Sequence, residues 1–448
     1  MFLYFCTIIE VSVWIYIKMK KLDRATPPSV RMLNELNVIF PERHRMKNGI
    51  PLNVLNIGTE DVVRLDIVIG AGQWHQTQAL QAMFTNRMLR EGTVSKTSQQ
   101  ISEELDYYGA MMELSSSVNC GFITLYSLNK YFPRTLSLVA DMLLHSTFPE
   151  KEMRVVLDMN KQRFLVNSSR VEMVGRKALN RSLFGQEHPL GRYAEAEDYD
   201  CITPDILQDF YSQHYHSGNC SVYISGKVTP EITHCIKEAL GNSSWGEVKE
   251  AVPLQPMEPH PTTEKRIFVE RPDALQSSIK LGGFVMDRLH PDFLKARVMV
   301  TLFGGYFGSR LMSNIREDKG YTYGIGAGIV TYPNISVLAV STEAANEYAE
   351  AIIAETYKEM DRLQQDLVPQ AELDMVKNYM LGDWCRSYEG PFSMSDAWIY
   401  IETGGLDDGF FHRSIDAIQS ITCDEIRELA QKYLCKENLI EVVAGKKV

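Results

Sequence analysis

The stretch ITPDILQDFYSQHYHSGNCSVYISGK (residues 202–227) is matched 219 residues later by ITCDEIRELAQKYLCKENLIEVVAGK (residues 421–446). The two stretches share six identical residues in 26 positions, with every spacing kept. Each predicts a helix, then a loop that carries an Asn, then a short apolar strand, at residues 220–225 and 439–444. A repeat of about 200 residues is far too long for a solenoid unit, so it indicates a duplicated domain.

The composition is that of a globular protein with sizeable cores. The chain has 448 residues, of which 45% are hydrophobic and 23% are charged, which suggests two or three domains. The formal net charge of -11 argues against a nucleic-acid binder, since such a protein presents a basic face. The eight cysteines are scattered without a C-x-x-C pair, so we expect reduced thiols rather than a disulfide framework or a zinc knuckle.

Residues 1–21 form a hydrophobic N-terminal extension. The lysines of this extension follow the apolar run, whereas a secretory signal carries its positive charge before it. The run is also shorter than the roughly 20 residues of a membrane span, and Glu10 in its middle would be costly in lipid. Two interpretations stay open: a true start at Met19, or a weak anchor through residues 1–18. We expect a cytoplasmic protein without stable membrane association.

A proline-rich segment divides the rest of the chain. Residues 246–264 contain four prolines among charged residues, which is typical of an extended, semi-rigid connector. We therefore expect an N-terminal domain at residues 22–245 and a C-terminal domain at residues 265–448.

Strand and helix patterns are mixed within each half. Alternating apolar residues from Val63 to Ile69, with Arg64 and Asp66 between them, predict a half-buried strand. Thr97 and Gly109 are expected to cap the two ends of a helix. The predicted helices of the first half cover residues 77–91, 98–108, 133–145 and 150–165, and further strands lie near residues 111 and 122–126. Without a regular βαβ alternation, the fold class is α+β, with helices on one face of a largely antiparallel sheet.

Several motifs occur in the order of one known family. They are Gly92-Thr93, Leu183-Phe184-Gly185, His188-Pro189-Leu190-Gly191, Asn219, Gly226, Gln276-Ser277, Gly304-Gly305, Ser309-Arg310-Leu311 and the run from Arg316 to Tyr323 (REDKGYTY). Together they resemble the insulinase and mitochondrial processing peptidase family over residues 45–448. The resemblance implies two homologous domains that form half of a clamshell chamber.

The resemblance also implies a zinc site that this chain does not contain. Active members carry H-x-x-E-H on a helix, where two histidines on one face bind Zn²⁺ and the Glu acts as general base. Counting back from Gly92-Thr93, the corresponding positions hold Met83, Asn86 and Arg87. Met is a poor zinc ligand and Arg keeps its proton. We expect no catalytic residue, no metal and no cofactor in this chain.

No other residues replace these ligands. In active members a later helix supplies a third ligand, a Glu, but residues 159–171 contain no carboxylate. His214 and His216 are the only close pair of histidines, and residues two apart on a helix point in different directions. We therefore interpret the histidines as structural or surface residues.

A second part of the family's machinery is present. Arg316 and Tyr323 have the seven-residue spacing of an Arg and a Tyr that, in active members, contact the bound peptide near the scissile bond. A guanidinium and a phenol can hold the substrate carbonyl and the developing oxyanion. The alternative is that Arg316 makes a structural ion pair and Tyr323 lies on a half-buried strand face. An edge strand beside Tyr323 could also pair with an extended peptide.

Loss of the zinc ligands alongside an intact Arg–Tyr pair suggests a division of labour between two chains. Some family members pair a zinc-bearing subunit with a subunit that lacks the metal. The sequence thus predicts a non-catalytic, substrate-binding subunit of a heterodimeric zinc metallopeptidase that acts on peptides. The alternatives are a structural or scaffold core subunit and a peptide-binding homodimer, neither with a peptidase role.

Overall fold

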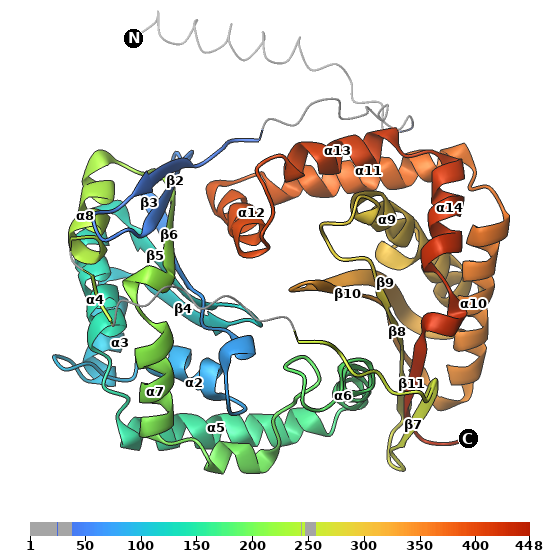
Figure 1. The fold of residues 1–448 in the computed structure, drawn as a ribbon, viewed down its shortest axis with the longest axis horizontal. Coiled ribbons are helices and arrows are strands. Elements are labelled where there is room, and N and C mark those ends of the chain that lie inside the picture. Colours follow the sequence, from blue (N-terminus) through green and yellow to red (C-terminus); the bar gives the residue numbers. More distant parts are fainter. Residues whose placement is uncertain (1–24, 26–37, 243, 247–256) are drawn as a thin grey trace, which may run out of the picture. The chain divides into compact units, whose positions relative to one another are not determined.

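Two β-sheets with packed helices make up the protein (Figure 1). A computed structural model describes residue 25 and residues 38–242, 244–246 and 257–448, and Asn37–Val448 is one compact unit. The predicted N-terminal extension and most of the predicted linker lie outside the described residues. The domain boundaries at residues 22–245 and 265–448 therefore stay predictions.

The first sheet has six strands, in the order β1-β2-β6-β3-β5-β4. These strands are β1 (Glu42–Arg45), β2 (Pro51–Asn56), β3 (Val62–Ile69), β4 (Met111–Ser116), β5 (Gly121–Leu128) and β6 (Cys220–Gly226). The helices between them and after them are η1 (Gln73–His75), α2 (Gln81–Met88), α3 (Ser98–Tyr108), η2 (Asn129–Tyr131), α4 (Phe132–His145), α5 (Glu150–Ser168), α6 (Val171–Phe184), η3 (Ala196–Asp200), α7 (Pro204–His214), η4 (Ser217–Asn219) and α8 (Pro230–Leu240).

The second sheet has five strands, in the order β7-β11-β8-β10-β9. These strands are β7 (Arg266–Glu270), β8 (Gln276–Val285), β9 (Thr322–Tyr332), β10 (Ile335–Ala345) and β11 (Ile440–Gly445). The helices are α9 (Phe293–Val300), the π-helical η5 (Thr301–Gly305) and η6 (Met312–Asp318), η7 (Asn346–Tyr348), α10 (Ala349–Gln365), α11 (Gln370–Ser387), α12 (Pro391–Thr403), α13 (Phe410–Ser420), α14 (Cys423–Tyr433) and η8 (Lys436–Asn438).

The two sheets share one topology, as the sequence repeat predicts. In each, the strand of the repeat pairs parallel with one neighbour and antiparallel with the other: β6 with β2 and β3, β11 with β7 and β8. The first sheet has β1 in addition, beyond β2. The helix of each repeat begins at a Thr whose hydroxyl accepts a backbone N–H, Thr203 before α7 and Thr422 before α14. The largely antiparallel α+β class is confirmed.

Local end signals predicted helices well, except at α2. Thr97 and Gln100 form a reciprocal capping box, and Gly109 ends α3 with φ of 61°. The helix predicted for residues 77–91 is shorter, covering only Gln81–Met88, because Leu80 adopts a left-handed conformation with φ of 73°. A non-glycine residue in that region interrupts helical geometry, so the helix begins after it.

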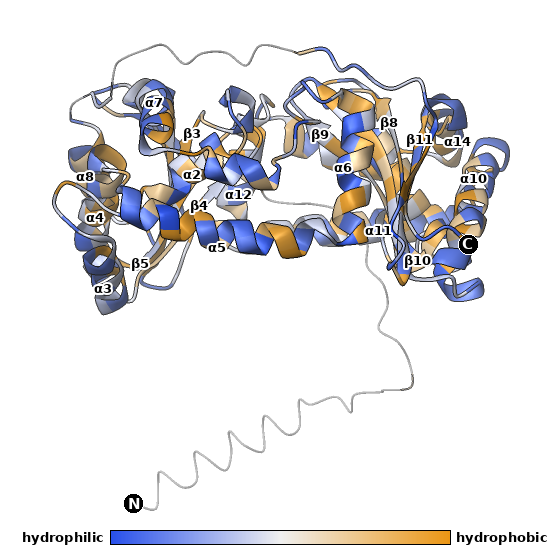
Figure 2. Ribbon diagram, turned by 90° about the horizontal axis from the view of Figure 1, so that it is seen from below, coloured by the Kyte–Doolittle hydropathy of each residue, from blue (hydrophilic) through white to orange (hydrophobic). Residues whose placement is uncertain are grey.

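One face of each sheet is covered by a helix from the other half of the chain. Helix α6, which precedes β6, packs on β8 and β11 of the second sheet through Leu179, Leu183 and Phe184. Gly175 permits the close approach, since a Cβ there would lie 3.0 Å from the hydroxyl of Ser278. In the view of Figure 2, strands β8 and β11 beside α6 are largely hydrophobic.

Helix α12 makes the reciprocal contact with the first sheet. Its Trp398 is fully buried and packs in one cluster with Leu55, Val68 and Tyr223 of that sheet. This cluster lies on the sheet face opposite the main helical core, because neighbouring strand residues such as Val222 and Ile224 belong to that other core. The domain's own helices thus cover one face of the sheet, as predicted, and a helix from the other half of the chain packs on the other face.

This exchange of helices overturns the prediction that β3 is half-buried. Arg64 and Asp66 are only 5% and 2% exposed, because α12 covers the face that they occupy. Arg64 Nε donates to Asp66 Oδ2 at 2.8 Å, its Nη1 donates to the Phe392 carbonyl at 3.2 Å, and its Nη2 pairs with Asp396. Burial raises the pKa of Asp66 although Arg64 opposes it, so the pair only partly offsets the cost of desolvation.

The described residues also bear on the predictions about membrane spans and cysteines. Within that part of the chain, no helix is both long and apolar enough to cross a membrane. The seven cysteines that it contains are all free thiols.

We expect Arg64→Ala to destabilise the fold by about 3–5 kcal/mol, since it leaves Asp66 buried without its cation. Urea unfolding followed by circular dichroism measures the loss. The control is Arg154→Ala, which removes an exposed ion pair with Glu150 on α5 and should cost at most about 1 kcal/mol. Equal losses in the two variants would contradict the structural role of Arg64.

Candidate functional site

Helix α2 carries the positions that correspond to the zinc motif. It packs against β4, β5 and α7. Asn86, at the position of the general base, is 1% exposed, and Met83 is half-buried against the core of the first domain. Arg87 is half-buried, and its Nε has no hydrogen-bond partner within the described residues.

Asn86 is held by a buried tyrosine. Its Nδ2 donates to the hydroxyl of Tyr215 at 3.2 Å, and Tyr215 is 1% exposed. Gly121 leaves room for this contact, since a Cβ there would lie 3.0 Å from both Asn86 Nδ2 and the Tyr215 hydroxyl oxygen. Burial raises the pKa of Tyr215, so the pair is neutral and does not exchange protons near pH 7. It is a packing contact rather than an acid–base pair.

These residues do not fit a catalytic zinc ion. No group of three or more His, Cys, Asp or Glu side chains that could hold a metal occurs in the described part of the chain. Asp158 lies one residue before the stretch 159–171 on α5 but joins no such group. The ring of His214 lies 5.1 Å from that of His75, and His216 is 2% exposed. The absence of zinc from this chain stays a prediction, because no measurement of metal content tests it.

Arg316 and Tyr323 do meet in space. Arg316 lies in the π-helical segment η6, and its Nε donates to the carbonyl oxygen of Tyr323 at 3.0 Å. The Tyr323 side chain is 93% exposed, so it does not lie on a half-buried strand face. The ion pair of Arg316 with the adjacent Glu317 is long, at 3.6 Å, and half-exposed. This contact brings the two predicted residues together, and it leaves their functional role to experiment.

A bulge directs Tyr323 outward from the sheet edge. Strand β9 lies at the end of the second sheet and pairs only with β10 among the described strands. The register shifts between Thr342 and Ala344, opposite Tyr323, so one extra residue is inserted in β9. Thr322 fixes the bulge by donating to the Glu343 carbonyl at 2.7 Å. Such bulges bend a strand and re-aim a side chain, and they are frequent beside functional sites.

Aromatic residues next to the pair were missed by the sequence analysis. The guanidinium of Arg316 lies 4.5 Å from the ring centroid of Phe307, a cation–π contact, and Phe307 is 62% exposed. Its neighbour Tyr306 packs on Tyr379 of α11 with ring centroids 4.9 Å apart. The only signal in the sequence was the Gly304-Gly305 pair just upstream. A Cβ at Gly304 would lie 2.6 Å from that of Ala327, so this segment can approach β9 closely only with glycine there.

Two carboxylates of α10 position the segment that carries Arg316. Asn314 Nδ2 donates to Glu359 at 2.6 Å and to Glu355 at 3.3 Å. Lys319 bridges the other end, with its Nζ 3.1 Å from Glu355 and 2.9 Å from Asn314 Oδ1. Charge-assisted hydrogen bonds of this kind are about twice as strong as neutral ones, so the network fixes the turn on both sides of Arg316.

The Glu355 network should make stability depend on pH. A hydrogen bond from Lys358, with further contacts from Lys319 and Asn314, lowers the pKa of Glu355 to about 2. Because the folded pKa lies below the unfolded value, this stability is present above about pH 4.5 and is lost as the pH falls toward 2. We expect Glu355→Gln to lose about 1–2 kcal/mol less unfolding free energy in acid than the wild type. This value is smaller than the pKa shift alone implies, because solvent screens the exposed lysines.

Urea unfolding at pH 7, 4.5 and 3 measures this difference. The control is Glu350→Gln, whose exposed pair with Arg266 should change the acid-induced loss little. A Glu355→Gln protein that loses as much stability in acid as the wild type would contradict the network.

A double-mutant cycle tests the structural reading of Asn86. We expect Asn86→Ala to destabilise the protein by about 1–3 kcal/mol, because the buried Tyr215 hydroxyl loses its partner. Tyr215→Phe should make the loss from Asn86→Ala smaller, and thermal unfolding measures each variant. Additive effects would show that the two side chains do not interact.

Comparisons with known proteins agree with this fold. The family model described as "Insulinase (Peptidase family M16)" matches residues 54–193, and "Peptidase M16 inactive domain" matches residues 202–380. The solved structure of a peptidase M16 inactive domain from Pseudomonas fluorescens superposes with a TM-score of 0.80 at 22% identity, covering 91% of this chain and 98% of that one. A protease from Helicobacter pylori also gives 0.80, at 15% identity, covering 91% of this chain and all of the other.

Curated relatives carry two kinds of name. The "Uncharacterized zinc protease YmxG" of Bacillus subtilis is 23% identical over 78% of this chain and 84% of its own length. The "Non-peptidase homolog YmxG" of Helicobacter pylori is 23% identical over 92% of both chains. With both family models matched in the expected order, the chain belongs to peptidase family M16, the insulinase family, and it carries the domain that the family describes as inactive.

Proposed function

We propose that this protein is the non-catalytic, substrate-binding subunit of a heterodimeric zinc metallopeptidase that acts on peptides. One contrast supports the proposal. The zinc-motif positions on α2 hold Asn86, which is buried against Tyr215, and Met83 and Arg87, which are half-buried. Arg316 and Tyr323, in contrast, meet on an exposed edge strand. A homologous partner with the intact motif would hold the zinc, and this chain would hold none.

In this assignment the chain supplies substrate contacts to a shared chamber. Zinc on the partner supplies Lewis-acid activation of the carbonyl and of a water molecule. The Nε of Arg316 is bound to the Tyr323 backbone and its Nη1 lies 3.6 Å from Glu317, and the terminal nitrogens still have donor capacity for a peptide carbonyl. The exposed Tyr323 hydroxyl can donate a second hydrogen bond to the developing oxyanion. The free edge of β9 can pair with an extended peptide.

A structural or scaffold subunit is the second candidate. On that assignment the contact of Arg316 with Phe307 and with the Tyr323 backbone would be its whole role. The name "non-peptidase homolog" of the Helicobacter pylori relative is compatible with either assignment, since both lack activity in the isolated chain. A peptide-binding homodimer is a third possibility, and co-purification distinguishes it.

We expect Arg316→Ala to lower the peptidase activity of the assembled pair roughly 10²-fold, the effect of losing one oxyanion donor. The partner is first identified by a tagged pull-down from the native host followed by mass spectrometry. Hydrolysis of a quenched fluorescent peptide by the purified pair then gives kcat and KM. The loss should fall mainly on kcat, because the contact strengthens in the transition state.

The matched control is Arg386→Ala, an arginine on α11 that is 78% exposed and pairs with Asp383. It should leave activity within about twofold of the wild type, because exposed pairs of this kind contribute little. Unchanged activity of Arg316→Ala in an intact pair would remove the substrate-binding assignment and favour the scaffold. Recovery of the chain with itself alone would remove the heterodimer.

A further inference from the structure

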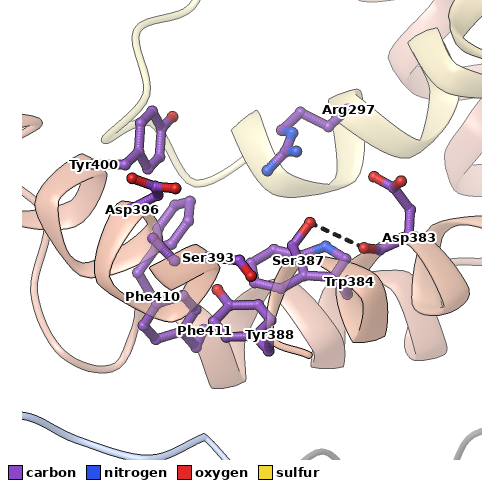
Figure 3. Close-up of a pocket in the computed structure, with 11 residues that line it drawn as sticks. Arg297, Asp383, Trp384, Ser387, Tyr388, Ser393, Asp396, Tyr400, Phe410 and Phe411 are labelled. Atoms are coloured by element: carbon purple, nitrogen blue, oxygen red, sulfur yellow. Dashed lines mark hydrogen bonds between the residues drawn. The ribbon is translucent and has the colours of Figure 1, made fainter. Parts of the chain in front are cut away.

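A cavity of about 420 Å³ lies in the second domain, away from both the α2 positions and the Arg316–Tyr323 pair (Figure 3). It opens between α9, α11, α12 and α13. Its lining consists of Arg297, Asp383, Trp384, Ser387, Tyr388, Ser393, Asp396, Ala397, Tyr400, Phe410 and Phe411. The volume is in the range of small-molecule pockets, which combine apolar walls with a few polar groups.

One wall of the cavity is an ordered aromatic surface. Trp384 and Tyr388, one helical turn apart on α11, stack with ring centroids 5.4 Å apart and planes inclined by only 5°. Phe411 closes the floor with its edge against Tyr388, at 4.9 Å and 83°. Trp384 and Tyr388 are half-buried and both line the cavity. Such a wall suits an aromatic ring of a ligand.

The opposite wall carries a cation without a carboxylate partner. The Arg297 side chain points into the cavity from α9 (Figure 3), and it makes no ion pair within the part of the chain that the structure describes. The two acids of the rim already have partners: Asp396 pairs with Arg64, and Asp383 pairs with Arg386. Because Arg64 is shared between Asp396 and Asp66, these charges balance overall, and the attraction for an anion comes from the local position of the Arg297 guanidinium.

Further groups at the cavity favour an anion. Arg288 lies over the ring of Tyr400 at 5.8 Å, so a second cation is next to one of the lining residues. Burial raises the pKa of Tyr388, although the charge of Arg297 opposes this, so its hydroxyl stays protonated and can donate. A carboxylate between Arg297 and Tyr388 would therefore receive a charge-assisted hydrogen bond and a neutral one.

We propose that this cavity binds a carboxylate attached to an aromatic group, with the carboxylate on Arg297 and the ring against Trp384 and Tyr388. The C-terminal residue of a peptide that ends in Phe, Tyr or Trp has this chemistry, and so does a free aromatic amino acid derivative. The site is separate from Arg316 and needs neither a partner nor zinc, so it stands or falls independently of the proposed function.

Isothermal titration calorimetry on the full-length chain tests the proposal with matched ligands. N-acetyl-phenylalanine and its amide have the same ring and differ in the carboxylate. We expect the acid to bind roughly 10- to 100-fold more tightly, as for a hydrogen bond to a charged group. Arg297→Gln should abolish this preference, whereas Arg154→Gln, which breaks an exposed ion pair on α5, should retain it.

The result that overturns the proposal is an acid and an amide that bind alike, or a preference that survives Arg297→Gln. If Arg297→Gln fails to fold, the test is instead the tryptophan fluorescence of the wild type compared with Trp384→Phe. A change in emission on adding the acid that disappears in Trp384→Phe supports the cavity, and one that persists there overturns it. The tripeptide Ala-Ala-Phe separates the sources: tighter binding than N-acetyl-phenylalanine indicates a peptide C-terminus, and equal binding indicates a small aromatic carboxylate.

Discussion

The exchange of α6 and α12 is the constraint on which the rest of the structure depends. A sheet has two faces, and the helices of each half cover only one of them. Without the helix from the other half, Val68 and Tyr223 of the first sheet and Ile440 of the second would be exposed. Burial of such surfaces contributes about 25 cal/mol per Å² of apolar area, so neither half is complete alone. The ion pair of Arg64 with Asp396 is a consequence of this exchange, because α12 brings its own carboxylate to the arginine that it covers.

The duplicated scaffold carries different chemistry in its two halves. Both halves share strand order, so the outer strands β4 and β9 occupy equivalent positions at the sheet edges. In the first half, α2 packs against β4 and β5 and buries the motif position held by Asn86. In the second half, the π-helical segments η5 and η6 replace regular helix beside β9. Irregular turns of this kind often mark functional sites, and here they hold Arg316 over Phe307.

Sequence patterns predicted features that depend on neighbouring residues, such as helix ends. They missed features that depend on contacts between residues far apart in the chain. The repeat predicted the duplication, and Thr97 with Gly109 predicted both ends of α3. Arg64 and Asp66 were assigned to an open face, because the helix that buries them lies some 330 residues away in the chain. The spacing of Arg316 and Tyr323 was readable, but the bulge that exposes Tyr323 depends on pairing with β10. The cavity beside Arg297 joins four helices, and no local signal marks it.

Folding stability explains why Asn86 stands at its buried position on α2, but it does not explain why Tyr323 is exposed beside Arg316. A glutamate at the Asn86 position would be a buried charge without a metal, and such a group is costly unless it is paired. Asn86 carries no charge and donates a hydrogen bond to Tyr215, so it avoids the cost of a buried carboxylate at this position. No such argument applies to Tyr323, because a side chain that is 93% exposed contributes little to packing. Glu355 and Glu359 nevertheless hold its neighbouring turn in one conformation. The order of this turn therefore comes from the carboxylates of α10, and the exposure of Tyr323 adds little to the stability of the fold.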